Sequence, residues 1–206
     1  MSTISFDHLA VTAAGPTLAA HPWLLDLSEA TASWVIFVVP ATLVWLWIRG
    51  EGSARQAAVT AALSAGVALS VSGMLSFLFY VPRPFALGLA PNVTGHVLDS
   101  SFPSDHVAVM SAVAAALLIG ERRWSGSAVA LAALAVGAAR VALGIHFPTD
   151  ILAAALLGVA AASIFRLHRL NDFATFCRDL MELAYAGLGL EDVAERIHLK
   201  KHQEIT

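Results

Sequence analysis

A small set of polar residues interrupts an otherwise apolar chain, and their types and spacing suit chemistry on a phosphate group. The set comprises Arg83 and Pro84, then Ser104, Asp105 and His106, then Arg140, and finally His146 and Asp150. Arginine offers a permanently charged, forked donor that matches phosphate oxygens. Pro103 and Pro148 favour helix starts, and a helix N-terminus presents free N–H groups to an anion. Two arginines beside two helix starts predict a phosphate pocket.

The histidines of this set could carry out the reaction. A histidine acts as a nucleophile or acid–base group near neutrality because its reference pKa is about 6.5. His146 and Asp150 are within reach of each other across one helical turn, so we expect the carboxylate to hold one ring nitrogen and leave the other free to attack. His106 would protonate the departing oxygen. The set predicts phosphoryl transfer through a phosphohistidine.

Each residue also has a simpler explanation. Ser104 could be only a helix N-cap, and Asp150 only a first-turn acid that the helix dipole favours. Arg83 could be an interfacial residue whose charged end reaches water. The isolated histidines are read as incidental: His8, His21 and His96. The predicted topology places the whole set at one face of the membrane. Separate explanations for each residue do not account for this gathering, whereas a phosphate site does.

A zinc site is the main chemical alternative. His106, His146 and Asp150 are acceptable zinc ligands. Such a site would leave Arg83 and Arg140 unexplained and repelled by the metal. We therefore expect no metal and no other cofactor.

The composition predicts an integral membrane protein. Of 206 residues, 58% are hydrophobic and 13% charged, whereas a soluble domain carries roughly a quarter charged residues. Apolar stretches long enough for a bilayer core of about 30 Å recur along the chain. We expect an all-α bundle of about five transmembrane helices, at 31–48, 56–80, 104–120, 125–145 and 148–167.

Shorter segments flank these spans. Residues 1–170 are expected to form the membrane domain, with residues 1–30 as one or two interfacial helices that turn at Gly15-Pro16. Residues 171–206 are expected to form a cytoplasmic tail with an amphipathic helix, which lies on the inner leaflet or makes a dimer contact. Residues 81–103 form a long outer loop, and a loop of that length is uncommon unless functional or disordered.

The distribution of charge predicts the orientation. Of the twelve Lys and Arg residues, only Arg83 and Arg140 fall outside one side of the predicted membrane. The positive-inside rule makes the basic side cytoplasmic, so the C-terminus lies inside and the polar set faces outward. The net charge of −3 and the absence of a basic groove argue against nucleic-acid binding. A single cysteine, Cys177, excludes an intramolecular disulfide.

The motifs resemble the PAP2 (type 2 phosphatidic acid phosphatase) superfamily, whose pattern runs KxxxxxxRP, PSGH and SRxxxxxHxxxD. The matching pieces lie within residues 76–150: "RP" at 83–84, "PSDH" at 103–106 and "ARVALGIHFPTD" at 139–150. The resemblance implies that His146 attacks, Asp150 assists and His106 donates the proton. Phosphate contacts would come from Arg83, Pro84, Ser104, Asp105 and Arg140, without a metal.

The chain departs from this pattern at three positions. Ser76 stands where the family lysine would fall, Ala139 replaces a serine, and Asp105 replaces the glycine of the second motif. "SFPSDH" with "RPF" resembles the bacitracin-resistance-type undecaprenyl diphosphate phosphatases. This implies removal of the terminal phosphate of undecaprenyl diphosphate at the outer face of a bacterial plasma membrane.

Other functions stay open at this point. A phosphatase of the same fold could act on phosphatidylglycerophosphate, phosphatidate or lipid A, because no residue identifies the lipid tail. A non-catalytic polyprenyl-phosphate binder or flippase would also need the arginines, but it would not need His146 and Asp150. A homo-oligomer is possible.

Overall fold

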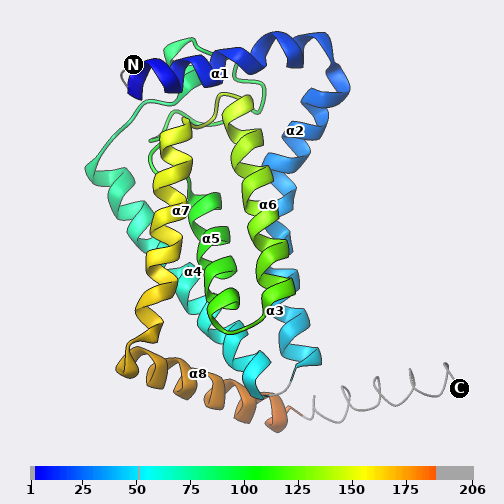
Figure 1. Cartoon of the computed structure of the whole chain (residues 1–206), viewed down its shortest axis with the longest axis vertical. Coiled ribbons are helices and arrows are strands. Elements are labelled where there is room, and N and C mark those ends of the chain that lie inside the picture. Colours follow the sequence, from blue (N-terminus) through cyan, green and yellow to red (C-terminus); the bar gives the residue numbers. More distant parts are fainter. Residues whose placement is uncertain (1–2, 51, 189–206) are drawn as a thin grey trace, which may run out of the picture.

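The computed structural model describes residues 3–50 and 52–188, and within these ranges it contains helices and one isolated β-bridge, between Pro82 and Ser100. The long helices are α1 (Thr3–Ala20), α2 (Pro22–Trp34), α3 (Val38–Arg49), α4 (Gly52–Leu78), α5 (Asp105–Ile119), α6 (Arg123–Ala142), α7 (Pro148–Ser163) and α8 (His168–Gly187). Short 3₁₀ turns occupy η1 (Val35–Phe37), η2 (Pro84–Leu87) and η3 (Ile164–Arg166). The prediction of an all-α membrane bundle is confirmed (Figure 1).

Helix α5 is the centre of the bundle. It packs against α4, α6 and α7, and its Met110, Val113 and Leu117 are completely buried. Four segments are long and apolar enough to cross a membrane: Pro22–Arg49, Gly52–Leu78, Arg123–Ala142 and Pro148–Arg166. They correspond to four of the expected spans. The remaining span, 104–120, is the shorter apolar helix α5, which the other helices surround.

The close crossing of α5 and α7 depends on Gly158. A Cβ at this position would lie 2.6 Å from the carbonyl oxygen of Ala108 and 2.6 Å from the amide nitrogen of Ala112. Small residues of this kind let membrane helices approach closely. We expect Gly158→Ala to destabilise the fold by about 1–3 kcal/mol, the usual cost of overpacking.

The thermal unfolding midpoint in detergent measures this effect. Gly66→Ala on α4 is the matched control, because a Cβ there meets nothing within 4 Å. Equal midpoints for the two variants would contradict the assigned role of Gly158.

The N-terminal region differs from the sequence prediction. Helix α1 runs through Gly15 and Pro16 without a turn, and the chain turns instead at His21. Pro22 then occupies the first turn of α2, where the missing proline N–H costs no hydrogen bond. The predicted turn was therefore wrong. Residues 22–30, expected at the interface, are the first part of the membrane-length segment Pro22–Arg49.

Helices α1 and α8 lie across opposite ends of the bundle (Figure 1). Helix α8 packs against α4, and the Arg55 guanidinium lies over the rings of Trp47 and Tyr185 at 5.2 Å and 5.3 Å. The helix expected in the tail is thus present. It begins before residue 171, so the expected domain boundary at 170/171 falls inside α8. Residues 189–206 of the predicted tail lie outside the described residues.

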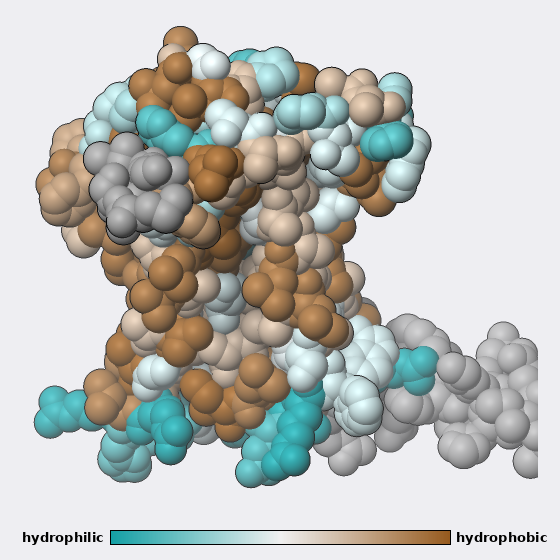
Figure 2. Space-filling model, turned by 45° about the horizontal axis from the view of Figure 1, so that its top comes forward, coloured by the Kyte–Doolittle hydropathy of each residue, from teal (hydrophilic) through white to brown (hydrophobic). Residues whose placement is uncertain are grey.

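The surface agrees with a membrane protein. On the face shown in Figure 2, largely hydrophobic residues cover the middle of the molecule, and hydrophilic residues gather at its lower end and in patches at its upper end. Leu131, Leu134 and Leu156 are each more than 60% exposed. Such a continuous apolar surface is expected where side chains face hydrocarbon.

Candidate active site

The predicted residues meet at the end of the bundle that α1 crosses. A cavity of about 430 Å³ is lined there by five of them: Arg83, Asp105, His106, Arg140 and His146. The other three, Pro84, Ser104 and Asp150, are buried and do not line the cavity. Residues from the end of α4 and from the loop 81–103 complete the wall. The structure thus brings the whole predicted set to one end of the bundle.

His146 is buried in a fixed orientation. Its Nδ1 lies 2.7 Å from the carbonyl oxygen of Ser101, which can only accept, so Nδ1 carries the proton and donates it. The other nitrogen, Nε2, then keeps a free lone pair. It lies 3.4 Å from Nη1 of Arg83 and 3.5 Å from Nη1 of Arg140. An unprotonated ring nitrogen between two guanidiniums suits attack on a bound phosphate.

Electrostatics keep this ring neutral. Burial lowers the pKa of His146 below its ordinary value, and the positive charges of Arg140 and Arg83 lower it further against the opposing influence of Asp150. At neutral pH the unprotonated form therefore dominates, and that form is the one able to attack phosphorus.

The two arginines are held differently. Arg83 donates from Nε to Asp99 Oδ1 at 2.6 Å and from Nη1 to the carbonyl of Ile145 at 3.1 Å. Arg140 is equally buried, yet its Nε has no hydrogen-bond partner in the described part of the chain, and neither does the Oγ of Ser104. Buried polar atoms are normally paired, so Arg140, which lines the cavity, is a candidate for binding a phosphate oxygen. The predicted phosphate contact of Ser104, which does not line the cavity, stays a prediction.

Asp150 does not hold the ring in the expected way. Its Oδ2 lies 3.8 Å from His146 Nδ1, beyond hydrogen-bond distance. That oxygen instead accepts from Ser101 Oγ at 2.5 Å and from the backbone N–H of Phe147 at 2.8 Å. The Asp150 carboxylate caps the start of α7. The Ser101 carbonyl, and not this carboxylate, accepts the hydrogen bond from Nδ1 of His146.

Helices α4 and α1 hold the loops of the site. Ser72 donates to Asp105 Oδ1 at 2.5 Å, and Ser76 donates to the carbonyl of Phe102 at 2.9 Å. The serine at the family lysine position thus fixes the stretch that carries Ser101. On α1, Asp7 accepts from Thr149 Oγ1 at 2.7 Å, and the ring of His8 stacks on Phe147. His8, read as incidental, therefore packs against the loop that carries His146.

The sequence marked the loop 81–103 by its length but did not identify which of its residues reach the cavity. His96, also read as incidental, lines the cavity together with Asp99 and Ser100. Although burial favours the neutral acid, the hydrogen bond and charge of Arg83 lower the pKa of Asp99. The length of the loop was the available signal, but no local pattern tells which of its polar residues turn inward.

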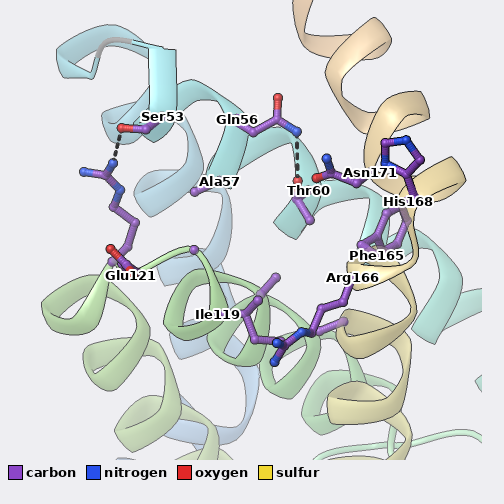
Figure 3. Close-up of a pocket in the computed structure, with 14 residues that line it drawn as sticks. Ser53, Gln56, Ala57, Thr60, Ile119, Glu121, Phe165, Arg166, His168 and Asn171 are labelled. Atoms are coloured by element: carbon purple, nitrogen blue, oxygen red, sulfur yellow. Dashed lines mark hydrogen bonds between the residues drawn. The ribbon is translucent and has the colours of Figure 1, made fainter.

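A second cavity, of about 600 Å³, lies at the α8 end of the bundle (Figure 3). Its labelled lining residues include Gln56 and Thr60 of α4, Arg166 of η3, and Asn171 of α8. None of the predicted site residues lines it. The reaction centre is therefore assigned to the cavity around His146.

The fold and the site together define a membrane lipid phosphatase. The chain belongs to the PAP2 superfamily, whose family model matches residues 57–173. It is 38% identical over 138 residues to the Escherichia coli protein named "Putative undecaprenyl-diphosphatase YbjG", covering 67% of this chain and 70% of that one. It is 24% identical to the undecaprenyl-diphosphatase BcrC of Bacillus subtilis, over 83% of this chain and 88% of that one.

Solved structures share the fold. Aquifex aeolicus LpxE superimposes with a TM-score of 0.59 at 27% identity, covering 70% of this chain and 86% of that one. A PAP2-type phosphatidylglycerolphosphate phosphatase from Bacillus subtilis gives 0.57 at 23% identity, covering 79% and 83%. The family-model match and the Escherichia coli relative confirm the predicted superfamily.

Proposed function

We propose that this protein removes the terminal phosphate of undecaprenyl diphosphate and releases undecaprenyl phosphate. The observation that carries the proposal is the unprotonated Nε2 of His146 between Arg83 and Arg140 in a cavity large enough for more than one phosphate. The names of the Escherichia coli and Bacillus subtilis relatives support the choice of substrate.

The geometry supports a two-step reaction. Nε2 of His146 attacks the terminal phosphorus, a P–N bond forms, and the bond from phosphorus to the bridging oxygen breaks. Arg83 and Arg140 neutralise the charge on the phosphoryl oxygens, while His106 gives a proton to the bridging oxygen. Water, deprotonated by His106, then attacks the phosphohistidine. The P–N bond breaks, inorganic phosphate leaves, and His146 is restored.

The mouth of the cavity suits a lipid. Phe77 and Tyr80, near the end of α4, line the cavity and are 88% and 63% exposed. Val97 and Leu98 in the neighbouring loop are also well exposed. Apolar side chains at the rim let an isoprenoid tail stay in hydrocarbon while the diphosphate reaches His146.

We further propose that the site faces outward from a bacterial plasma membrane and that the C-terminus is cytoplasmic. Apart from Arg83 and Arg140, the described basic residues belong to the α8 end of the bundle, opposite the site (Figure 1): Arg49, Arg55, Arg122, Arg123, Arg166, Arg169 and Arg178. This asymmetry supports the orientation by the positive-inside rule. Arg196, Lys200 and Lys201 lie outside the described residues.

Phosphate release by the purified chain in detergent tests the substrate. We expect kcat/KM for undecaprenyl diphosphate to exceed that for phosphatidylglycerophosphate or phosphatidate by about tenfold or more, the equivalent of one additional charge-assisted hydrogen bond. EDTA should leave the rate unchanged, because histidine supplies the nucleophile. A preference for a glycerolipid would contradict the proposed substrate and retain the phosphatase class.

A further inference from the structure

The loop residue His96 has a position that the reaction described above does not use. We propose that His96 binds the second phosphate of the substrate, the one that stays on the lipid, and so makes the site prefer diphosphates to monophosphates. This proposal rests on the proposed function. It assigns a specificity role to a residue outside the three sequence motifs.

The need for such a residue follows from the leaving group. When a lipid diphosphate is cleaved, the departing group is itself a charged phosphate, whereas a lipid monophosphate releases an alcohol. A cavity that favours the diphosphate must therefore provide a donor beyond the groups that hold the terminal phosphate. Ser76 replaces the family lysine, and both lysines of the chain lie at positions 200 and 201.

The other donors of the cavity already have partners or roles. Ser76 donates to the carbonyl of Phe102, and Ser100 lies within hydrogen-bond distance of the carbonyls of Phe79 and Phe102. His106 is the proposed acid, and Tyr80 lies at the exposed rim. The remaining side-chain donor is the ring of His96, for which the described part of the chain provides no hydrogen bond.

The loop holds His96 in place before any substrate binds. Asn92 Nδ2 donates to the carbonyl of His96 at 2.9 Å, and the N–H of His96 donates to Asn92 Oδ1 at 2.9 Å. Further along the loop, Asp99 is fixed to Arg83. His96 therefore lies between two anchored points, and a preorganised donor loses little freedom on binding.

The electrostatics are compatible with this role. Burial, followed by the charges of Arg83 and Arg140, lowers the pKa of His96 to about 4. The ring is therefore neutral at neutral pH and does not repel the guanidiniums in the empty site. A neutral imidazole still donates one N–H, and a phosphate beside it favours the protonated form, which donates two.

The test compares one prenyl chain carrying either a diphosphate or a monophosphate. For purified full-length His96→Ala, we expect the ratio of the two kcat/KM values, diphosphate over monophosphate, to fall about tenfold, mainly through KM for the diphosphate. The monophosphate rate should stay within about twofold of wild type. His96→Lys should retain the preference, because an ammonium supplies a charged donor in the same place. His168→Ala, at a 91% exposed side chain on α8, is the matched control.

Equal losses on both substrates, or no loss on either, would overturn the assignment of His96. If His96→Ala does not purify as a folded protein, His96→Leu allows the same comparison, because its larger apolar side chain fills the space without donating a hydrogen bond. A wild-type enzyme without preference for the diphosphate would instead overturn the proposed function, and the wild-type rates alone reveal that case.

Discussion

Replacing His146 with asparagine is expected to reduce phosphate release by about 10⁴-fold or more, because the substitution removes the proposed nucleophile. Asparagine is close to histidine in size and can still donate to the Ser101 carbonyl, so the fold should be kept. The arginines remain in place, and we expect the variant to bind substrate within a few-fold of wild type. Initial rates and equilibrium binding in the same detergent measure the two effects.

Trapping the intermediate makes this prediction specific. Substrate labelled in its terminal phosphate, quenched without acid, should leave label on the wild-type protein and none on His146→Asn. The label should be acid-labile and stable to base, as expected for a P–N bond. His168→Asn is the control for a lost histidine, since its side chain is 91% exposed on α8. Turnover by the His146 variant would contradict the mechanism, and binding without turnover by wild type would favour a non-catalytic carrier protein.

The sequence predicted which motif residues cluster in space better than it predicted the contacts of the loops. Arg140, His146 and Asp150 lie within one motif, at the end of α6 and the start of α7. Their spacing along the chain therefore already places them close together. The membrane spans could also be predicted from the sequence, because the length of an apolar stretch alone identifies a membrane segment. Asp105 lines the cavity, as expected of a residue near the phosphate, and its carboxylate also accepts from Ser72 and ties α5 to α4.

The missed contacts depend on backbone groups and on distant parts of the chain. The partner of His146 is a main-chain carbonyl at residue 101, and every residue type offers that group. The clamp of Asp7 on Thr149 joins residues far apart in sequence. His96 lines the cavity on a loop that the side chain of Asn92 bridges by hydrogen bonds. Local patterns do not carry such information, since it arises from tertiary packing.

Asp150→Asn is expected to lower kcat by about 10²-fold, less than the loss of His146, because Asp150 acts on the ring through Ser101. Outer partners of metal-ligating histidines typically contribute about 10–100-fold, and we expect an effect of similar size for this histidine. The Asp150 carboxylate holds Ser101 Oγ, and the carbonyl of the same residue orients Nδ1 of His146. Asparagine removes the charge and weakens this chain of contacts while KM should change little.

A double-mutant cycle with Ser101→Ala tests whether Asp150 acts by this route. Ser101→Ala deletes the hydroxyl but retains the carbonyl, and we expect a loss of about tenfold. If Asp150 acts through Ser101, the double variant should be no slower than Asp150→Asn alone, because both changes break one chain of contacts. If Asp150 instead stabilises the charged ring directly, the losses should multiply to about 10³-fold and the pH profile of kcat should shift in Asp150→Asn but not in Ser101→Ala. The 3.8 Å separation of Asp150 from the ring favours the first result.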